Sequence, residues 1–113
     1  MLLEAGAAVD LRTANGRTAL MVASQNGHEG TVRLLLEAGA AVNLKTTNWQ
    51  TALILACNNG HAAAVRVLLE AGAAVDLKDT NGGMALIAAS HNGHEGALRL
   101  LVEAGATVDS KNT

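Results

Sequence analysis

The first apolar pattern in the chain predicts a short helix. Leu20 and Ala23 are three positions apart, so both lie on one face of a helix that runs from about residue 19 to residue 26. Thr18 precedes this helix as its N-cap, because the hydroxyl oxygen accepts a hydrogen bond from a free N–H group of the first turn. Gly27 ends the helix, since glycine readily takes the left-handed conformation there.

A second apolar pattern predicts a second helix directly after the first. Val32, Leu35 and Leu36 share one face of a segment from about residue 29 to residue 38, and Gly39 ends this segment. Both predicted helices are shorter than the roughly 12–15 residues at which an isolated helix becomes marginal in water. Each helix therefore depends on packing against its neighbours.

The whole pattern returns every 33 residues. No insertion interrupts the period, so each copy is one structural unit repeated in register. The motif Leu-Glu-Ala-Gly-Ala, with Val for Leu in its last copy, begins at Leu3, Leu36, Leu69 and Val102, and the motif Asn-Gly-His begins at Asn26, Asn59 and Asn92.

The repeated residues resemble the ankyrin repeat, and the resemblance covers nearly the whole chain. It implies an all-α solenoid of stacked helix-turn-helix units with projecting β-hairpin-like loops, in a family of protein-binding scaffolds without catalysis. The residues that carry it in the first copy are Gly16 to Leu20, Ala23, Gly27, His28, Val32, Leu34 to Leu36, Gly39, Ala40, Val42 and Asn43.

The period also divides the chain. We expect a partial repeat over residues 1–12, full repeats over residues 13–45, 46–78 and 79–111, and a tail of residues 112–113.

The start of the first helix departs from the family pattern Thr-Pro-Leu-His. Ala replaces Pro in every copy, and Met21, Ile54 and Ile87 replace His. We expect apolar packing between repeats to replace the hydrogen bond that His makes to Thr. Met84 stands at the capping position of the third copy, which removes a cap worth about 0.5–2 kcal/mol.

The turn before the first helix holds Gly16 and Gly82 in two copies but Trp49 in the middle copy. The family turn commonly needs a positive φ, which Trp tolerates poorly, so this loop is either reshaped or strained. Two interpretations stay open. Trp49 lies on neighbouring side chains in a loop that has drifted, or it anchors a binding interface, where Trp is enriched.

Both ends of the array are predicted to be uncapped. Met1 aligns with Leu34, so the chain is expected to begin inside the last turn of a second helix. An excised array, an engineered array and end-to-end stacking of copies all fit such ends, because exposed apolar patches promote association. The outer face of the third repeat keeps the apolar residues Leu86, Ile87, Leu98 and Leu101.

Composition narrows the function classes. The 113 residues are 50% hydrophobic but 1% aromatic, and 16% charged with a net charge of -2, which disfavours binding to nucleic acid. No segment has the form of a signal peptide or approaches the roughly 20 apolar residues of a membrane span. The lone Cys57 cannot form an intramolecular disulfide. We expect a cytoplasmic or otherwise intracellular protein, with the nucleus left open, and no membrane partner.

Catalytic residues, a cofactor and a metal ion are not expected. His28-Glu29 and His94-Glu95 lack the second histidine of a zinc-protease motif. The loop histidines belong to separate repeats about 10 Å apart, too far to share a metal ion. The family implies structural histidines that bond to backbone. Cys57 aligns with serines in the other copies and is predicted to be a packing residue.

The family resemblance implies a protein-binding surface instead. Its members bind partners through the loop tips and the exposed face of the first helices. At some of these positions, such as Gln25, Asn58 and His91, the copies differ. Carried over position by position, the candidates are Asn15, Arg17, Gln25, Asn26, Asn48, Trp49, Gln50, Asn58, Asn59, Asn81, His91 and Asn92.

The leading hypothesis is a non-catalytic protein–protein interaction module. The alternative is a structural repeat scaffold without a specific partner, which forms homo-oligomers through its uncapped ends.

Overall fold

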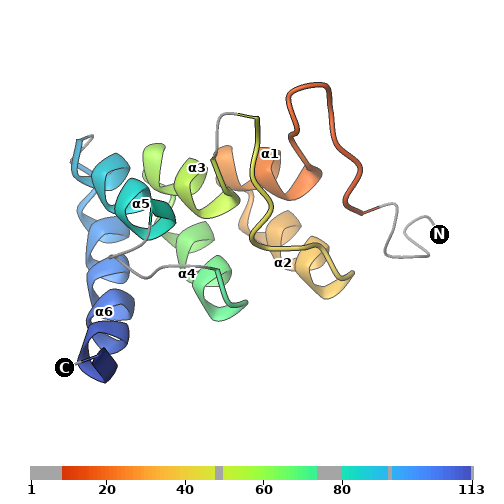
Figure 1. Cartoon of the computed structure of the whole chain (residues 1–113). Helices are drawn as coiled ribbons and strands as arrows, with labels where there is room; N and C mark the ends of the chain where they lie inside the picture. The colour runs from red at the N-terminus through yellow and green to blue at the C-terminus, as the bar shows by residue number, and fades with distance from the viewer. Residues whose placement is uncertain (1–8, 48–49, 74–79, 92, 113) are drawn as a thin grey trace.

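The computed structural model describes residues 9–47, 50–73, 80–91 and 93–112, with the backbone alone for residues 80–84 and 106–112. These ranges form α-helices and no strand. The helices lie in two rows, with α1, α3 and α5 packed side by side in one and α2, α4 and α6 in the other (Figure 1). They are α1 (Ala19–Gln25), α2 (Glu29–Glu37), α3 (Ala52–Asn58), α4 (Ala62–Glu70), α5 (Thr80–His91) and α6 (Glu95–Asn112).

Threonine caps begin the first helices of the first two repeats, as predicted. Thr18 and Thr51 have extended backbones with φ of -102° and -99°. Their hydroxyl oxygens accept hydrogen bonds from the backbone N–H groups of Met21 at 3.3 Å and Ile54 at 3.2 Å. Met21 and Ile54 are buried, as the expected apolar packing requires, whereas Ile87 at the same position of the third repeat is 68% exposed. The Met21 Sδ also accepts a hydrogen bond from the Thr18 backbone N–H at 3.4 Å.

Glycines end these helices at the predicted places. α1 is capped by Asn26, and Gly27 follows with φ of 72°. α2 is capped by Ala38, and Gly39 follows with φ of 98°. Both helices therefore end within one residue of the predicted boundary.

The helices of the third repeat are longer than the period predicts. Met84 has no hydroxyl to cap a helix, and the helical backbone of α5 continues upstream of it to Thr80. At the other end, Gly105 lies inside α6, whereas the corresponding Gly39 and Gly72 have positive φ. The loop after Gly39 is held by a neighbouring repeat, since Ala41 N–H donates to Asp10 Oδ1 at 3.1 Å. In α6 the backbone N–H and C=O groups are instead paired with one another within the continued helix.

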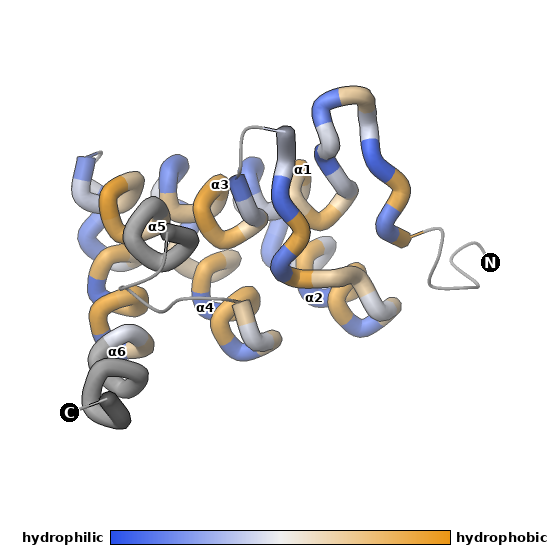
Figure 2. The backbone as a smooth tube through the Cα atoms, viewed as in Figure 1, coloured by the Kyte–Doolittle hydropathy of each residue, from blue (hydrophilic) through white to orange (hydrophobic). Residues whose placement is uncertain are grey.

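The core lies between the two rows and between successive repeats (Figure 2). Leu20 and Leu53 are each 1% exposed, whereas Leu86 at the same position of the third repeat is half-buried. This leucine position therefore faces the following repeat. None of the described helices is long and apolar enough to cross a membrane.

The prediction that Leu101 lies on the outer face of the third repeat is wrong. Leu101 is fully buried, as is Leu68 one repeat earlier, while Leu35 in the first repeat is only half-buried. This position therefore faces the preceding repeat, whose helix α4 packs against α6.

Candidate functional site

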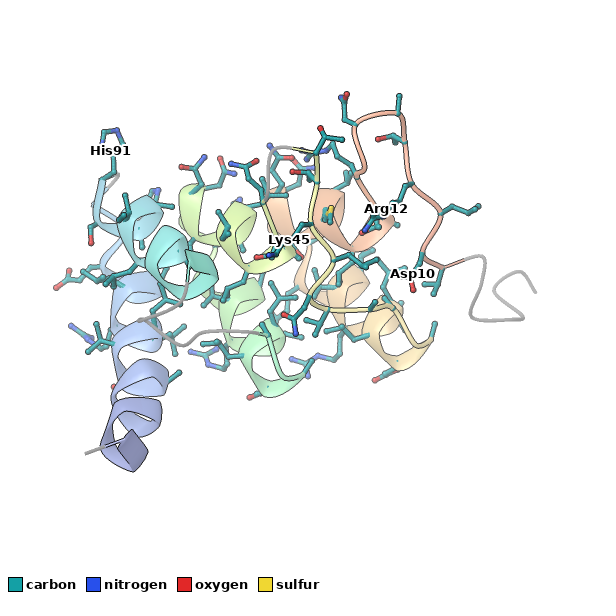
Figure 3. The ribbon with its side chains drawn as sticks, viewed as in Figure 1. Asp10, Arg12, Lys45 and His91 are labelled. Carbon is teal, nitrogen blue, oxygen red and sulfur yellow. The ribbon has the colours of Figure 1, made fainter. Side chains whose placement is uncertain are left out.

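A groove runs between the first helices of the second and third repeats. Its apolar part comes from both helices, with the buried Ile54 of α3 and the 68% exposed Ile87 of α5. Polar side chains border it, and His91 projects from the end of α5 (Figure 3). The lining residues are Gln50, Ile54, Asn58, Ile87, Ala88 and His91.

The structure thus brings three of the predicted binding residues together, namely Gln50, Asn58 and His91. Ile87, which was expected on the outer face of the third repeat, is 68% exposed and also lines this groove. Sequence reasoning did not include Ile54, Ile87 or Ala88 among the candidates. The signal was present, because Ile54 and Ile87 occupy the position at which the family usually has a polar His.

The loops that precede α1 and α3 have the same hairpin-like bonding, and the second of them ends at Gln50, which lines the groove. Thr13 N–H donates to Arg17 O at 3.0 Å, and Thr46 N–H donates to Gln50 O at 2.9 Å, one period later. Thr47 N–H donates to Asn15 O at 3.1 Å and joins the two loops. This bonding fixes the direction in which the loop side chains project.

The close approach of these loops needs the glycine of the first turn. Gly16 has φ of 78°, and a Cβ built on it would lie 3.2 Å from the Thr47 backbone nitrogen. Arg17 follows directly, and its guanidinium donates a hydrogen bond to Gln25 Oε1 at the end of α1. Two predicted binding residues of the first repeat therefore hold each other in place.

Two further candidates partly serve to cap their own helices. Asn26 Nδ2 donates to Val22 O at 2.9 Å, and Asn59 Nδ2 donates to Leu55 O at 3.0 Å. Both asparagines are exposed although their amide nitrogens are bonded.

Four candidates are not placed by the structure. Asn48, Trp49 and Asn92 lie outside the described residues, as does the side chain of Asn81. The two interpretations of Trp49 therefore both stand as predictions.

His61 and His94 contact the preceding repeat. His94 Nε2 lies 3.2 Å from Asn58 O, which fits the expected bond from a structural histidine to backbone. Among the described residues there is no cluster of three His, Cys, Asp or Glu side chains that could hold a metal ion.

Cys57 is fully buried in α3, and burial raises the pKa of its thiol to about 12. The thiolate, which is the nucleophilic form, is therefore scarce at neutral pH. Ser24 occupies the same position in α1, and its buried hydroxyl oxygen has no hydrogen-bond partner in the described chain. A thiol suits this apolar position better than a hydroxyl, because it is less costly to desolvate.

This pKa predicts a loss of stability at alkaline pH. The unfolded thiol ionises near its ordinary pKa of 9.0, while the folded one keeps its proton up to about pH 12. Ionisation of this thiol leaves the free energy of unfolding unchanged below about pH 9. As the pH rises from 9 toward 12, it lowers that free energy by about 1.4 kcal/mol per pH unit. Between pH 8 and pH 10.5, we expect urea denaturation to show a loss of about 2 kcal/mol in the free energy of unfolding.

The matched control is Cys57→Ser, because serine occupies this position in the other repeats. The variant is expected to lose about 2 kcal/mol less than the wild-type chain over the same pH range. Equal losses in both proteins would contradict the assignment of this effect to Cys57.

Comparisons with known proteins agree with the repeat architecture. A family model described as "Ankyrin repeat" matches residues 15–47, and one described as "Ankyrin repeats (3 copies)" matches residues 39–112. No curated protein matches the chain. Among solved structures, the crystal structure of the human ASB11 ankyrin repeat domain is similar, with a TM-score of 0.76 and 35% sequence identity. The match covers 84% of this chain and 42% of that one.

Proposed function

Because the chain belongs to the ankyrin-repeat family, whose members are typically non-catalytic interaction modules, we propose that it binds a protein partner in the groove between α3 and α5. The loop that precedes α3 and ends at Gln50 extends this surface. The proposal applies equally to a natural, an excised or an engineered array.

The exposed Ile87 carries the proposal. It is 68% exposed, although the core residue Ile54 at the same position of the second repeat is 2% exposed. Together Ile87 and the buried Ile54 form an apolar surface, here called the apolar seat, against which a side chain of the partner can pack. Desolvation of such a seat is typical of the energetic centre of an interface.

The polar border favours a protein ligand. Gln50 and Asn58 contribute carboxamide groups and His91 an imidazole, and these groups donate and accept hydrogen bonds. We infer that the groove takes a peptide segment whose apolar side chain contacts Ile87 while its backbone bonds to the border residues. None of the described residues that line this groove is Lys or Arg, which fits a partner without a phosphate backbone.

The experiment selects displayed peptides on the immobilised wild-type chain and measures their affinity for two variants. Ile87→Asp is expected to weaken binding by at least tenfold, because it places a charge in the apolar seat. Leu34→Asp is the matched control. Leu34 is 67% exposed but lies on α2, in the other row of helices. Selected peptides that bind both variants as well as the wild-type chain, or that lose affinity only for Leu34→Asp, would count against the groove.

We also propose an intracellular location, which the lone Cys57 and its burial support. Fluorescence microscopy of the tagged chain in cells tests this, and recovery of the chain from the culture medium would contradict it.

A further inference from the structure

Successive repeats are joined by a histidine ring that packs against a glycine. A Cβ built on Gly27 would lie 2.5 Å from His61 Nδ1, and one built on Gly60 would lie 2.4 Å from His94 Nδ1. These distances are too short for a real side chain. The histidine ring therefore occupies the space that the missing glycine side chain leaves, and the contact recurs with the 33-residue period.

The two ends of the array present the separate halves of this same contact. At one end, a Cβ built on Gly93 would meet no atom of the described chain within 4 Å, beyond its own chain neighbours. At the other end, His28 is exposed and lines an open hollow.

Both halves already have the conformation of the occupied contacts. Gly93 has φ of 69°, compared with 72° for Gly27 and Gly60. His28 has φ of -84° and ψ of 79°, compared with -88° and 80° for His61. No backbone change is needed for the ring of His28 to pack against a glycine in this conformation.

The N-terminal end also exposes residues that a preceding repeat would bury. Ala19 is exposed and Val22 is 42% exposed, whereas Ala52 and Leu55 at the same positions of the second repeat are 1% and 3% exposed. Burial of this apolar surface on association is favourable.

The C-terminal end shows the complementary pattern. Leu86 and Leu98 are half-buried, whereas their counterparts Leu53 and Val65, which the third repeat covers, are 1% and 0% exposed. Each end therefore exposes the residues that the opposite end would cover in a continued stack.

The charges at the two ends are also complementary. Arg12 and Arg17 line the hollow at the N-terminal end. Glu95 and Glu103 line the hollow on α6, where Arg99 lies 3.6 Å from Glu95. Opposite charges on the two surfaces favour a head-to-tail encounter over contacts between like ends.

We propose that the chain associates head to tail with a second copy of itself, the His28 ring of one copy packing against Gly93 of the other. The junction copies the contact between the His94 ring and Gly60. The carbonyl oxygen of His91 then takes the place of that of Asn58, which lies beside the His94 ring within the chain. Because the two surfaces differ, each added copy leaves a free end, and assembly is open-ended. Ile87 is exposed where its counterparts Met21 and Ile54 are 1% and 2% exposed, so the second copy also covers this residue of the groove.

Sedimentation velocity on the full chain, from low micromolar to near-millimolar concentration, tests the proposal. We expect the average mass to rise continuously from 11.5 kDa and to exceed that of a dimer. A chain that stays monomeric over the whole series, because another segment or nothing at all covers these ends, would overturn it.

Two substitutions remove one half of the junction each. His28→Ala removes the ring, and Gly93→Ala places a Cβ where the ring would lie. Each is expected to weaken association by at least tenfold. Gly72→Ala is the matched control, because Gly72 has φ of 95° and also meets nothing within 4 Å but belongs to neither end. It carries the same backbone penalty and is expected to assemble like the wild-type chain. Assembly of His28→Ala or Gly93→Ala at wild-type affinity would contradict the assigned contact.

A mixture of the two variants separates the junction from a general loss of folding. The His28→Ala chain keeps Gly93, and the Gly93→Ala chain keeps His28, so the mixture has one intact junction per pair. We expect a heterodimer that grows no further. A mixture that stays monomeric, or one that forms open-ended assemblies, would overturn the proposed register.

Discussion

Gly60→Ala is expected to lower the free energy of unfolding by about 2–4 kcal/mol. Gly60 has φ of 72°, a conformation that costs a residue with a Cβ about 1–2 kcal/mol. The new methyl group would also lie 2.4 Å from His94 Nδ1, so the ring must leave its place between the second and third repeats. Urea denaturation followed by circular dichroism, at low protein concentration, measures the loss.

Gly93→Ala separates the two causes. Its φ of 69° gives the same backbone penalty, but no described atom outside its chain neighbours lies near the new methyl group. We expect a loss of about 1–2 kcal/mol for this variant, clearly smaller than that of Gly60→Ala. Equal losses would show that the packing of the histidine ring contributes nothing to the coupling of repeats.

Leu53→Ala is expected to lower the free energy of unfolding by about 2–5 kcal/mol. Leu53 is 1% exposed in α3, which packs against α1, α4 and α5. Removal of its side chain leaves a cavity with walls on all sides, and such walls relax only partly. Because α3 is the central helix of its row, the cavity also weakens the packing on both neighbouring repeats. The same denaturation experiment measures this loss.

Leu86→Ala is the matched control for Leu53→Ala. The residue has the same position in the third repeat but is only half-buried, so its removal opens a space that solvent can enter. We expect a loss less than half that of Leu53→Ala. A larger loss for Leu86→Ala would contradict the placement of the core at the middle repeat.

The repeat period was sufficient to predict most of the fold. Helix boundaries were predictable because they depend on local effects. Threonine at positions 18 and 51 caps a helix by a hydrogen bond, and glycine at positions 27 and 39 follows a helix end with a positive φ. The stacking order follows because each short helix needs a neighbour to bury its apolar face.

The third repeat could not be predicted in the same way. The period assigned Gly105 the same role as Gly39, yet it lies inside a continuous helix. The difference depends on contacts between repeats, such as the bond from Ala41 to Asp10, and a local pattern does not contain them. Leu101 was misplaced for a related reason, since helical spacing identifies an apolar face but not which neighbour it contacts.

The candidate site was predicted only in part. Loop and helix-end residues such as Gln50 and His91 follow from the family pattern, and the structure places both at one groove. The apolar seat was missed because Ile54 and Ile87 occupy equivalent positions in the sequence. Their exposures of 2% and 68% come from the number of repeats that cover them, a property of position in the array.

The packing of each helix against its nearest neighbours also bears on the order in which the chain folds. Tertiary contacts join segments about one repeat apart, so each contact closes a short loop, and short loops close rapidly and at low entropic cost. The middle repeat is buried on both sides and begins at a capped helix, α3. We expect it to form the folding nucleus, onto which the first and third repeats then fold outward in either order.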